Sequence, residues 1–111
     1  MFKKNITCKI ILLYFFITLS FSFSAKSQTS VSIQTAEQAL SNGNYEKALD
    51  IWQILSNRGN LIAINNLGFM YERGYGVTRN QKKAVALYKK AAEGGIAVAQ
   101  FNYGEALFLG N

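Results

Sequence analysis

The 111-residue chain contains no histidine, no proline and a single cysteine, Cys8. Without histidine, the side chain that most often serves as a general base or a metal ligand is missing. A lone cysteine has no partner for a disulfide within the chain. These absences exclude histidine-based catalysis, histidine metal sites and a fold held by internal disulfides.

Carboxylates are also scarce, with six in the chain, and they are scattered. Glu46 and Asp50 share a helical face at i and i+4, a pair that fits a solvated outer surface better than a catalytic dyad. After residue 24 the sequence has no G-x-S-x-G, G-x4-G-K-[ST] or S-x-x-K motif. The glycines at 74 and 76 lack the third glycine and preceding strand of a nucleotide-binding loop. We therefore predict no catalytic residue, no metal and no cofactor, and a protein that is not an enzyme.

The N-terminal residues have the pattern of an export signal. Three basic residues, Lys3, Lys4 and Lys9, precede an apolar block at residues 10–23. Small residues then stand at the −3 and −1 positions of a cleavage site after Ser24, and a second site follows Ser27. The alternative is a membrane anchor, but a helix of this block would reach about 21 Å across a hydrocarbon core of about 30 Å. We expect a signal peptide over 1–24, a flexible segment over 25–30, and a bacterial protein that is periplasmic or secreted.

Cleavage would change the charge of the protein. The whole chain has a net charge of +6, and loss of residues 1–24 leaves nine basic side chains against six acidic ones. An exported chain with so small a basic excess is a poor candidate for nucleic-acid binding. We expect no nucleic-acid partner.

The remaining chain repeats with a period of 36 residues. Small residues match small ones, aromatic residues mostly match apolar ones, and glycines match glycines; Trp52 falls on Tyr88, Gly59 on Gly95, and Gly68 on Gly104. Within a unit the apolar spacing is helical, as in Ala63, Leu67 and Tyr71. A repeat of this length is typical of a solenoid, in which each unit covers the apolar face of the next.

Glycine and asparagine mark the ends of the expected helices. Helices are predicted near 31–41 and 45–57, joined by a four-residue turn at 41–44 in which Asn42 or Asn44 caps the second helix. Gly74 is expected to stop the third helix in a left-handed conformation, with Thr78 or Asn80 capping the next one, which ends at 93–95. Inside helices, Gly68 and Gly104 each cost about 1 kcal/mol relative to alanine. Close approach of a neighbouring helix is the expected compensation.

The pattern A-x3-LG-x2-Y-x2-G-x-GV, followed by A-x2-LY-x2-AA-x2-G-x3-A, resembles the Sel1-like repeat family, relatives of the tetratricopeptide repeat. Its anchor positions here are Ala63, Leu67, Gly68, Tyr71, Gly74, Gly76, Ala84, Tyr88, Ala91, Ala92, Gly95 and Ala99, with Gly104 in the next copy. The resemblance implies an all-α fold, a short right-handed α-solenoid of about two and a half units over 31–59, 60–95 and 96–111. It also implies a non-catalytic scaffold for a protein or peptide. A cysteine-rich branch of the family binds or hydrolyses β-lactams, and the missing cysteines separate this chain from that branch.

In this family the first helix of each repeat lines the concave side, which implies a ligand groove. The residues expected there are Asn65, Asn66, Phe69, Arg73, Phe101, Asn102 and Glu105. Amide groups there would bond a peptide backbone, and phenylalanines would add apolar area. The alternative for Asn66 and Asn102 is that they bond neighbouring loops and only shape the turns.

Two other surfaces are candidates for contact. Lys82, Lys83, Lys89 and Lys90 are expected on the outer face of the helix over 80–93, either as a solvated convex surface or as a weak attachment to anionic lipid or cell wall. The last helix has no second helix to cover it, so Ile96, Tyr103, Leu107 and Phe108 should be half buried and Leu109 more exposed. Solenoids usually end in a polar cap. We therefore expect self-association through this helix, with a longer parent array as the alternative.

Overall fold

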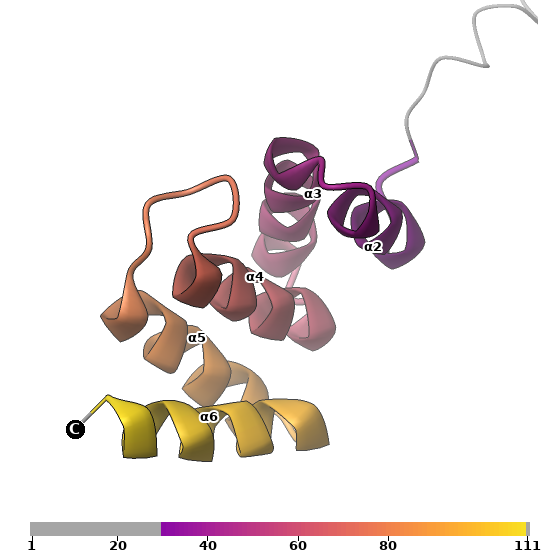
Figure 1. The fold of residues 1–111 in the computed structure, drawn as a ribbon. Helices are drawn as coiled ribbons and strands as arrows, with labels where there is room; N and C mark the ends of the chain where they lie inside the picture. The colour runs from indigo at the N-terminus through magenta and orange to yellow at the C-terminus, as the bar shows by residue number, and fades with distance from the viewer. Residues whose placement is uncertain (1–29, 111) are drawn as a thin grey trace, which may run out of the picture.

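The computed structural model describes residues 30–110, which form five α-helices and, within that range, no strand (Figure 1). The helices are α2 (Ile33–Ser41), α3 (Tyr45–Asn57), α4 (Leu61–Arg73), α5 (Gln81–Glu93) and α6 (Ala97–Leu109). The predicted signal peptide, the predicted flexible segment apart from Ser30, and Asn111 lie outside the described residues. Within 30–110, no helix combines the length and apolar character needed to cross a membrane.

Each helix packs on the one before it in sequence, α2 on α3, α3 on α4, α4 on α5 and α5 on α6. Figure 1 shows the result as a stack in which α5 lies between α4 and α6. The order of packing follows from the short connections, since a helix hairpin closes most easily on its neighbour. The prediction of an all-α helical repeat solenoid is confirmed.

Side-chain caps set the first residue of most helices. Ser32 begins α2 by accepting a hydrogen bond from the Thr35 N–H, so this helix starts two residues later than predicted. Because Ser41 is still helical, the turn to α3 has three residues, not four. Asn44, not Asn42, caps α3.

The longer loop between α4 and α5 also follows its sequence signals. Gly74 ends α4 with φ at 71°, in the left-handed region that favours glycine. Asn80, not Thr78, caps α5 by accepting a hydrogen bond from the Lys83 N–H at 3.0 Å. Among the five described helices, only α6 lacks a side-chain hydrogen bond at its N-cap, which is Ile96.

Two aromatic side chains 36 residues apart are at the centre of the core. Trp52 is fully buried among residues of α2, α3 and α4, and Tyr88 is 1% exposed between Ala84 and Ala106. A third cluster, Ile64, Ala91 and Ala99, joins α4, α5 and α6. Burial of a large apolar side chain contributes about 1.5–3 kcal/mol, so these clusters account for much of the cohesion between units.

The helix α6 is covered on one side only. Its buried residues are Ala99 and Ala106, while Ile96 and Tyr103 are half buried as predicted. Phe108 is 83% exposed, so the prediction that it is half buried is wrong, and Leu107 is also exposed. The reason is helical periodicity: Phe108 is two residues from buried Ala106, a rotation of about 200° that places it on the opposite face.

Candidate functional site

A chain of three asparagine side chains runs from α6 to α4, and one of its two hydrogen bonds joins the helices. The Asn102 amide nitrogen donates a hydrogen bond to the Asn65 oxygen at 3.0 Å, although 37 residues separate the two in sequence. The Asn65 nitrogen in turn donates to the Asn66 oxygen at 3.3 Å. Asn65 is 5% exposed, so its amide is part of the packed wall and not a surface open to a ligand. The bridge links the first helices of two successive repeats.

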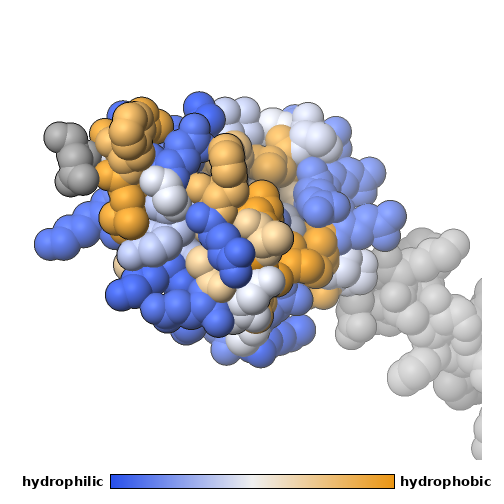
Figure 2. All heavy atoms as spheres, turned by 90° about the horizontal axis from the view of Figure 1, so that it is seen from below, coloured by the Kyte–Doolittle hydropathy of each residue, from blue (hydrophilic) through white to orange (hydrophobic). Residues whose placement is uncertain are grey.

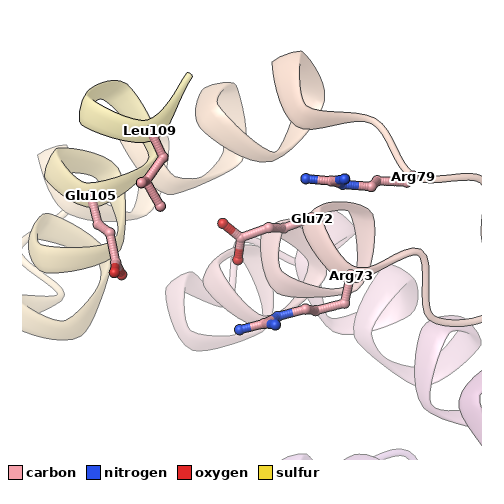
Figure 3. Close-up of a pocket in the computed structure, with 5 residues that line it drawn as sticks. All are labelled: Glu72, Arg73, Arg79, Glu105 and Leu109. Carbon is pink, nitrogen blue, oxygen red and sulfur yellow. The ribbon is translucent and has the colours of Figure 1, made fainter. Parts of the chain in front are cut away.

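Beyond this bridge the two helices enclose a hollow of about 420 Å³. It is lined by Glu72, Arg73, Arg79, Glu105 and Leu109. Figure 3 shows Glu72, Arg73 and Arg79 pointing toward α6, from which Glu105 and Leu109 point back. Glu72 is seven residues after Asn65, and Leu109 is seven residues after Asn102. Seven residues are about two helical turns, so Glu72 shares the face of Asn65 on α4 and Leu109 shares the face of Asn102 on α6.

Tyr88 fixes the position of Glu72, one of the residues that line the hollow. Its hydroxyl donates a hydrogen bond to a Glu72 carboxylate oxygen at 2.9 Å. Burial raises the pKa of the Tyr88 hydroxyl well above its usual value, and the Glu72 carboxylate raises it further. Tyr88 therefore remains a proton donor and orients Glu72 toward the hollow.

Gly68 makes this arrangement possible. A Cβ at position 68 would lie 2.9 Å from Tyr88 Cε1 and 3.3 Å from the Ala84 carbonyl oxygen. The first distance is shorter than a carbon–carbon contact allows and the second is tight, so the absent side chain admits the Tyr88 ring. The expected close packing is confirmed at Gly68. It is wrong at Gly104, where nothing lies within 4 Å of an added Cβ.

Arg73 connects the hollow to a cluster of aromatic rings. Its guanidinium carbon lies 5.5 Å from the centre of the Phe69 ring, which meets Tyr75 edge-on at 5.8 Å. Tyr75 is stacked on Tyr45 at 4.3 Å. Cation–π contact and ring stacking restrict Arg73, so its charge is presented to the hollow from a supported position.

The structure thus separates six of the seven predicted groove residues into three groups and leaves Phe101 apart. Arg73 and Glu105 line the hollow, Asn65, Asn66 and Asn102 form the bridge beside it, and Phe69 supports Arg73. Phe101 is 69% exposed on α6 and is not among the residues that line the hollow. Asn102 bonds to Asn65 on another helix and Asn66 accepts from Asn65 within α4, so neither bonds a loop as the alternative interpretation expected.

A comparison with protein families agrees with this geometry. The Sel1 repeat model matches residues 61–96 and 97–111, which correspond to α4 with α5 and to α6. This chain is a Sel1-like repeat protein. No curated protein and no solved structure matches the chain. Sel1 repeats generally mediate protein–protein interactions as scaffolds, and the family is generally non-catalytic.

Sequence reasoning missed three residues that line the hollow of this Sel1-like repeat protein, namely Glu72, Arg79 and Leu109. The signal for Glu72 and Leu109 was available, because each is seven residues from a predicted asparagine on the same helix. Arg79 lies in the loop before α5, and no helical periodicity places it.

The side chains around the hollow are groups that can bind a ligand. Two guanidinium and two carboxylate groups surround the hollow, beside one exposed leucine. In the stretch from 30 to 110, no three acidic or other ligating side chains gather closely enough to hold a metal ion. Charged groups of both signs around a shallow hollow fit recognition of a segment that also carries both signs.

Proposed function

We propose that this Sel1-like repeat protein is a non-catalytic scaffold that binds a peptide segment of a partner protein in the hollow between α4 and α6. The observation that supports it best is that two arginines, Arg73 and Arg79, and two glutamates, Glu72 and Glu105, line one hollow. Arg79 and Arg73 would bind an acidic side chain or a terminal carboxylate. Glu105 would bind a basic side chain, and Leu109 would cover an apolar one.

The neighbouring amides extend the site along the line where α4 and α6 meet. Asn66 is half buried, and its nitrogen is a donor beside the bridge. It would donate to a peptide carbonyl, while the bridge itself keeps α4 and α6 at a fixed separation. A preformed site of this kind lowers the entropy lost on binding.

The test is a selection of binders from a random peptide library on the purified protein, followed by fluorescence anisotropy with a selected peptide. Arg79→Glu and Glu105→Lys should each weaken binding about tenfold or more. Lys89→Glu is the matched control, since Lys89 is exposed on α5 and does not line the hollow. If no peptide is selected, or if all three variants bind equally well, the proposal is wrong.

We also propose that the protein works outside the cytoplasm, on the strength of the basic and apolar pattern of residues 3–23 and the small residues after it. Fractionation of expressing cells should recover it from the periplasm or the medium. Mass spectrometry should give an N-terminus at Ala25 or Gln28. An intact N-terminus in the membrane fraction would favour the anchor instead.

A second candidate function is weak attachment to an anionic surface. Lys82, Lys83, Lys89 and Lys90 are all exposed on α5, as the sequence predicts. Lys83 is also committed to Tyr71, whose hydroxyl it reaches at 2.8 Å. Binding to anionic vesicles that falls as salt rises would support this function, and no such binding would leave a solvated surface.

A further inference from the structure

The exposed face of α6 has a regular pattern that the proposed peptide site does not use. Four residues, Ala97, Phe101, Gly104 and Phe108, follow one another at intervals of four, three and four. This is the spacing of the contact seam in paired helices. All four residues are exposed, the phenylalanines by 69% and 83%, and none of them is charged. We call these four residues the α6 seam.

Figure 2, which views the molecule from the side on which α6 lies, shows apolar side chains over this helix among polar ones. Most of the exposed large apolar residues of the described chain are on α6. A monomer rarely leaves large apolar side chains gathered in this way unless they are a contact surface.

The seam is complementary to itself. When two copies of α6 are laid antiparallel so that Phe101 of one faces Gly104 of the other, Ala97 faces Phe108 in the same register. Each large side chain then meets a small one. Gly104 has open space around it, since nothing lies within 4 Å of an added Cβ, so it is free to receive a phenylalanine ring.

We propose that this face binds a second copy of the chain, forming a two-fold symmetric dimer through antiparallel packing of the α6 seams. Two-fold symmetry requires one surface to be its own complement, and the alternation of large and small residues meets this requirement. The α6 helix is about 20 Å long. A single helix pair of that length buries less than the roughly 1,200 Å² of a standard interface, so the dimer should be weak and dependent on concentration.

The internal repeat supplies the other possible occupant, a helix that covers α6 as α5 covers α4. Such a helix would use the positions equivalent to Ile64, Leu67, Gly68 and Tyr71, namely Gln100, Tyr103, Gly104 and Leu107. Tyr103 is already half buried, and the Gln100 amide nitrogen already donates to the Ala92 carbonyl oxygen at 3.4 Å. Leu107 is exposed by 43%, whereas Phe101 and Phe108 of the α6 seam are exposed by 69% and 83%, which favours the second copy.

The test is analytical ultracentrifugation of the purified protein over a wide concentration range, with the N-terminus confirmed by mass spectrometry. The wild type should convert reversibly from monomer to dimer. Phe101→Gly and Gly104→Phe should each weaken dimerisation about tenfold or more, because they place small against small or large against large. The double variant Phe101→Gly/Gly104→Phe restores large against small and should dimerise nearly as well as the wild type.

Val98→Glu is the control, since Val98 is 56% exposed on the same helix but off the seam, and it should leave dimerisation within a few-fold of wild type. Circular dichroism of each variant separates loss of dimer from loss of fold. A monomer at every concentration, or a double variant no better than the single ones, overturns the proposal. Loss of dimer on Leu107→Glu but not on Phe108→Glu would place the dimer contact on the Leu107 face and also overturn the proposal. None of these outcomes depends on peptide binding in the hollow.

Discussion

At the scale of single residues, Gly68 and Gly104 occupy equivalent positions in the repeat but have different surroundings. Gly68 is pressed against Tyr88 and the Ala84 carbonyl, whereas Gly104 faces open space. The same residue type thus serves close packing in one unit and leaves a notch in the next. Repeat equivalence in sequence does not imply equivalent contacts, because the contacts depend on which helix follows.

We predict opposite effects when a methyl group is added at these two positions. Gly68→Ala should lower the free energy of unfolding by about 1–3 kcal/mol, because the buried Tyr88 ring and a backbone carbonyl have little room to move. Gly104→Ala should raise it by up to about 1 kcal/mol through helix propensity alone. Urea denaturation of dilute protein measures both. Changes of the same sign would contradict the assignment of Gly68 to close packing.

Tyr88 gives a second prediction at this scale. Because the folded-state pKa of Tyr88 is raised above its usual value near 10, the stability it contributes is present below about pH 10 and is lost as the pH rises further. Tyr88→Phe removes the hydrogen bond to half-buried Glu72 and should cost about 1 kcal/mol at neutral pH. It should also flatten the loss of stability above about pH 10. Urea titrations at neutral and alkaline pH measure both effects, and an unchanged pH dependence would contradict them.

At the scale of elements, the helices begin where their asparagine and serine caps accept hydrogen bonds. Ser32, Asn44, Asn60 and Asn80 all accept from a backbone N–H three residues later. The sequence left a choice between Thr78 and Asn80 for α5. The structure resolves it, because only Asn80 immediately precedes the first helical residue and reaches the third.

The cap of α5 is testable with a matched pair of variants. Asn80→Ala should lower the free energy of unfolding by about 1 kcal/mol, because the Lys83 N–H loses its partner at the start of the helix. Thr78→Ala should change it by a few tenths of a kcal/mol at most, since Thr78 is exposed and outside the helix. Equal losses in the two variants, measured by thermal or urea unfolding, would show that the cap is not the cause.

At the scale of the whole molecule, α6 has fewer neighbours among the described helices than α4 has. The α4 helix packs on both α3 and α5, whereas α6 packs chiefly on α5 and buries only Ala99 and Ala106. In a solenoid, stability is shared between neighbouring units, so helices with one neighbour open more readily.

Hydrogen exchange should therefore differ between the helices. In dilute protein, the amides of α6 should exchange faster than those of α4 by about tenfold or more, a difference readable by mass spectrometry of peptides. If α6 dimerises, its protection should rise with protein concentration while that of α4 changes less. Equal protection of α4 and α6 in dilute protein would mean that α6 is held by contacts within the chain that the fold does not show.

Much of the fold could be predicted from the sequence, and less of the candidate site. Periodicity, the 36-residue repeat and the capping residues predict the end of α2, both ends of α3, and the ends of α4 and α5 closely. Arg73 and Glu105 were expected on one face, and both line the hollow. Glu72 was missed although its spacing from Asn65 places it on the same face, whereas Arg79 could not be predicted, since its position depends on how the loop before α5 is placed in space.

The sequence by itself determined the helices, their order and the family, because these depend on local propensities and on spacing along the chain. The tertiary structure decided which side chains meet. It brought Asn102 to Asn65 across 37 residues, turned Asn65 inward, and left Phe101 and Phe108 uncovered. The physical reason is that the angle between packed helices, which no single helix encodes, decides whether a side chain on the shared face is buried, bridged or free.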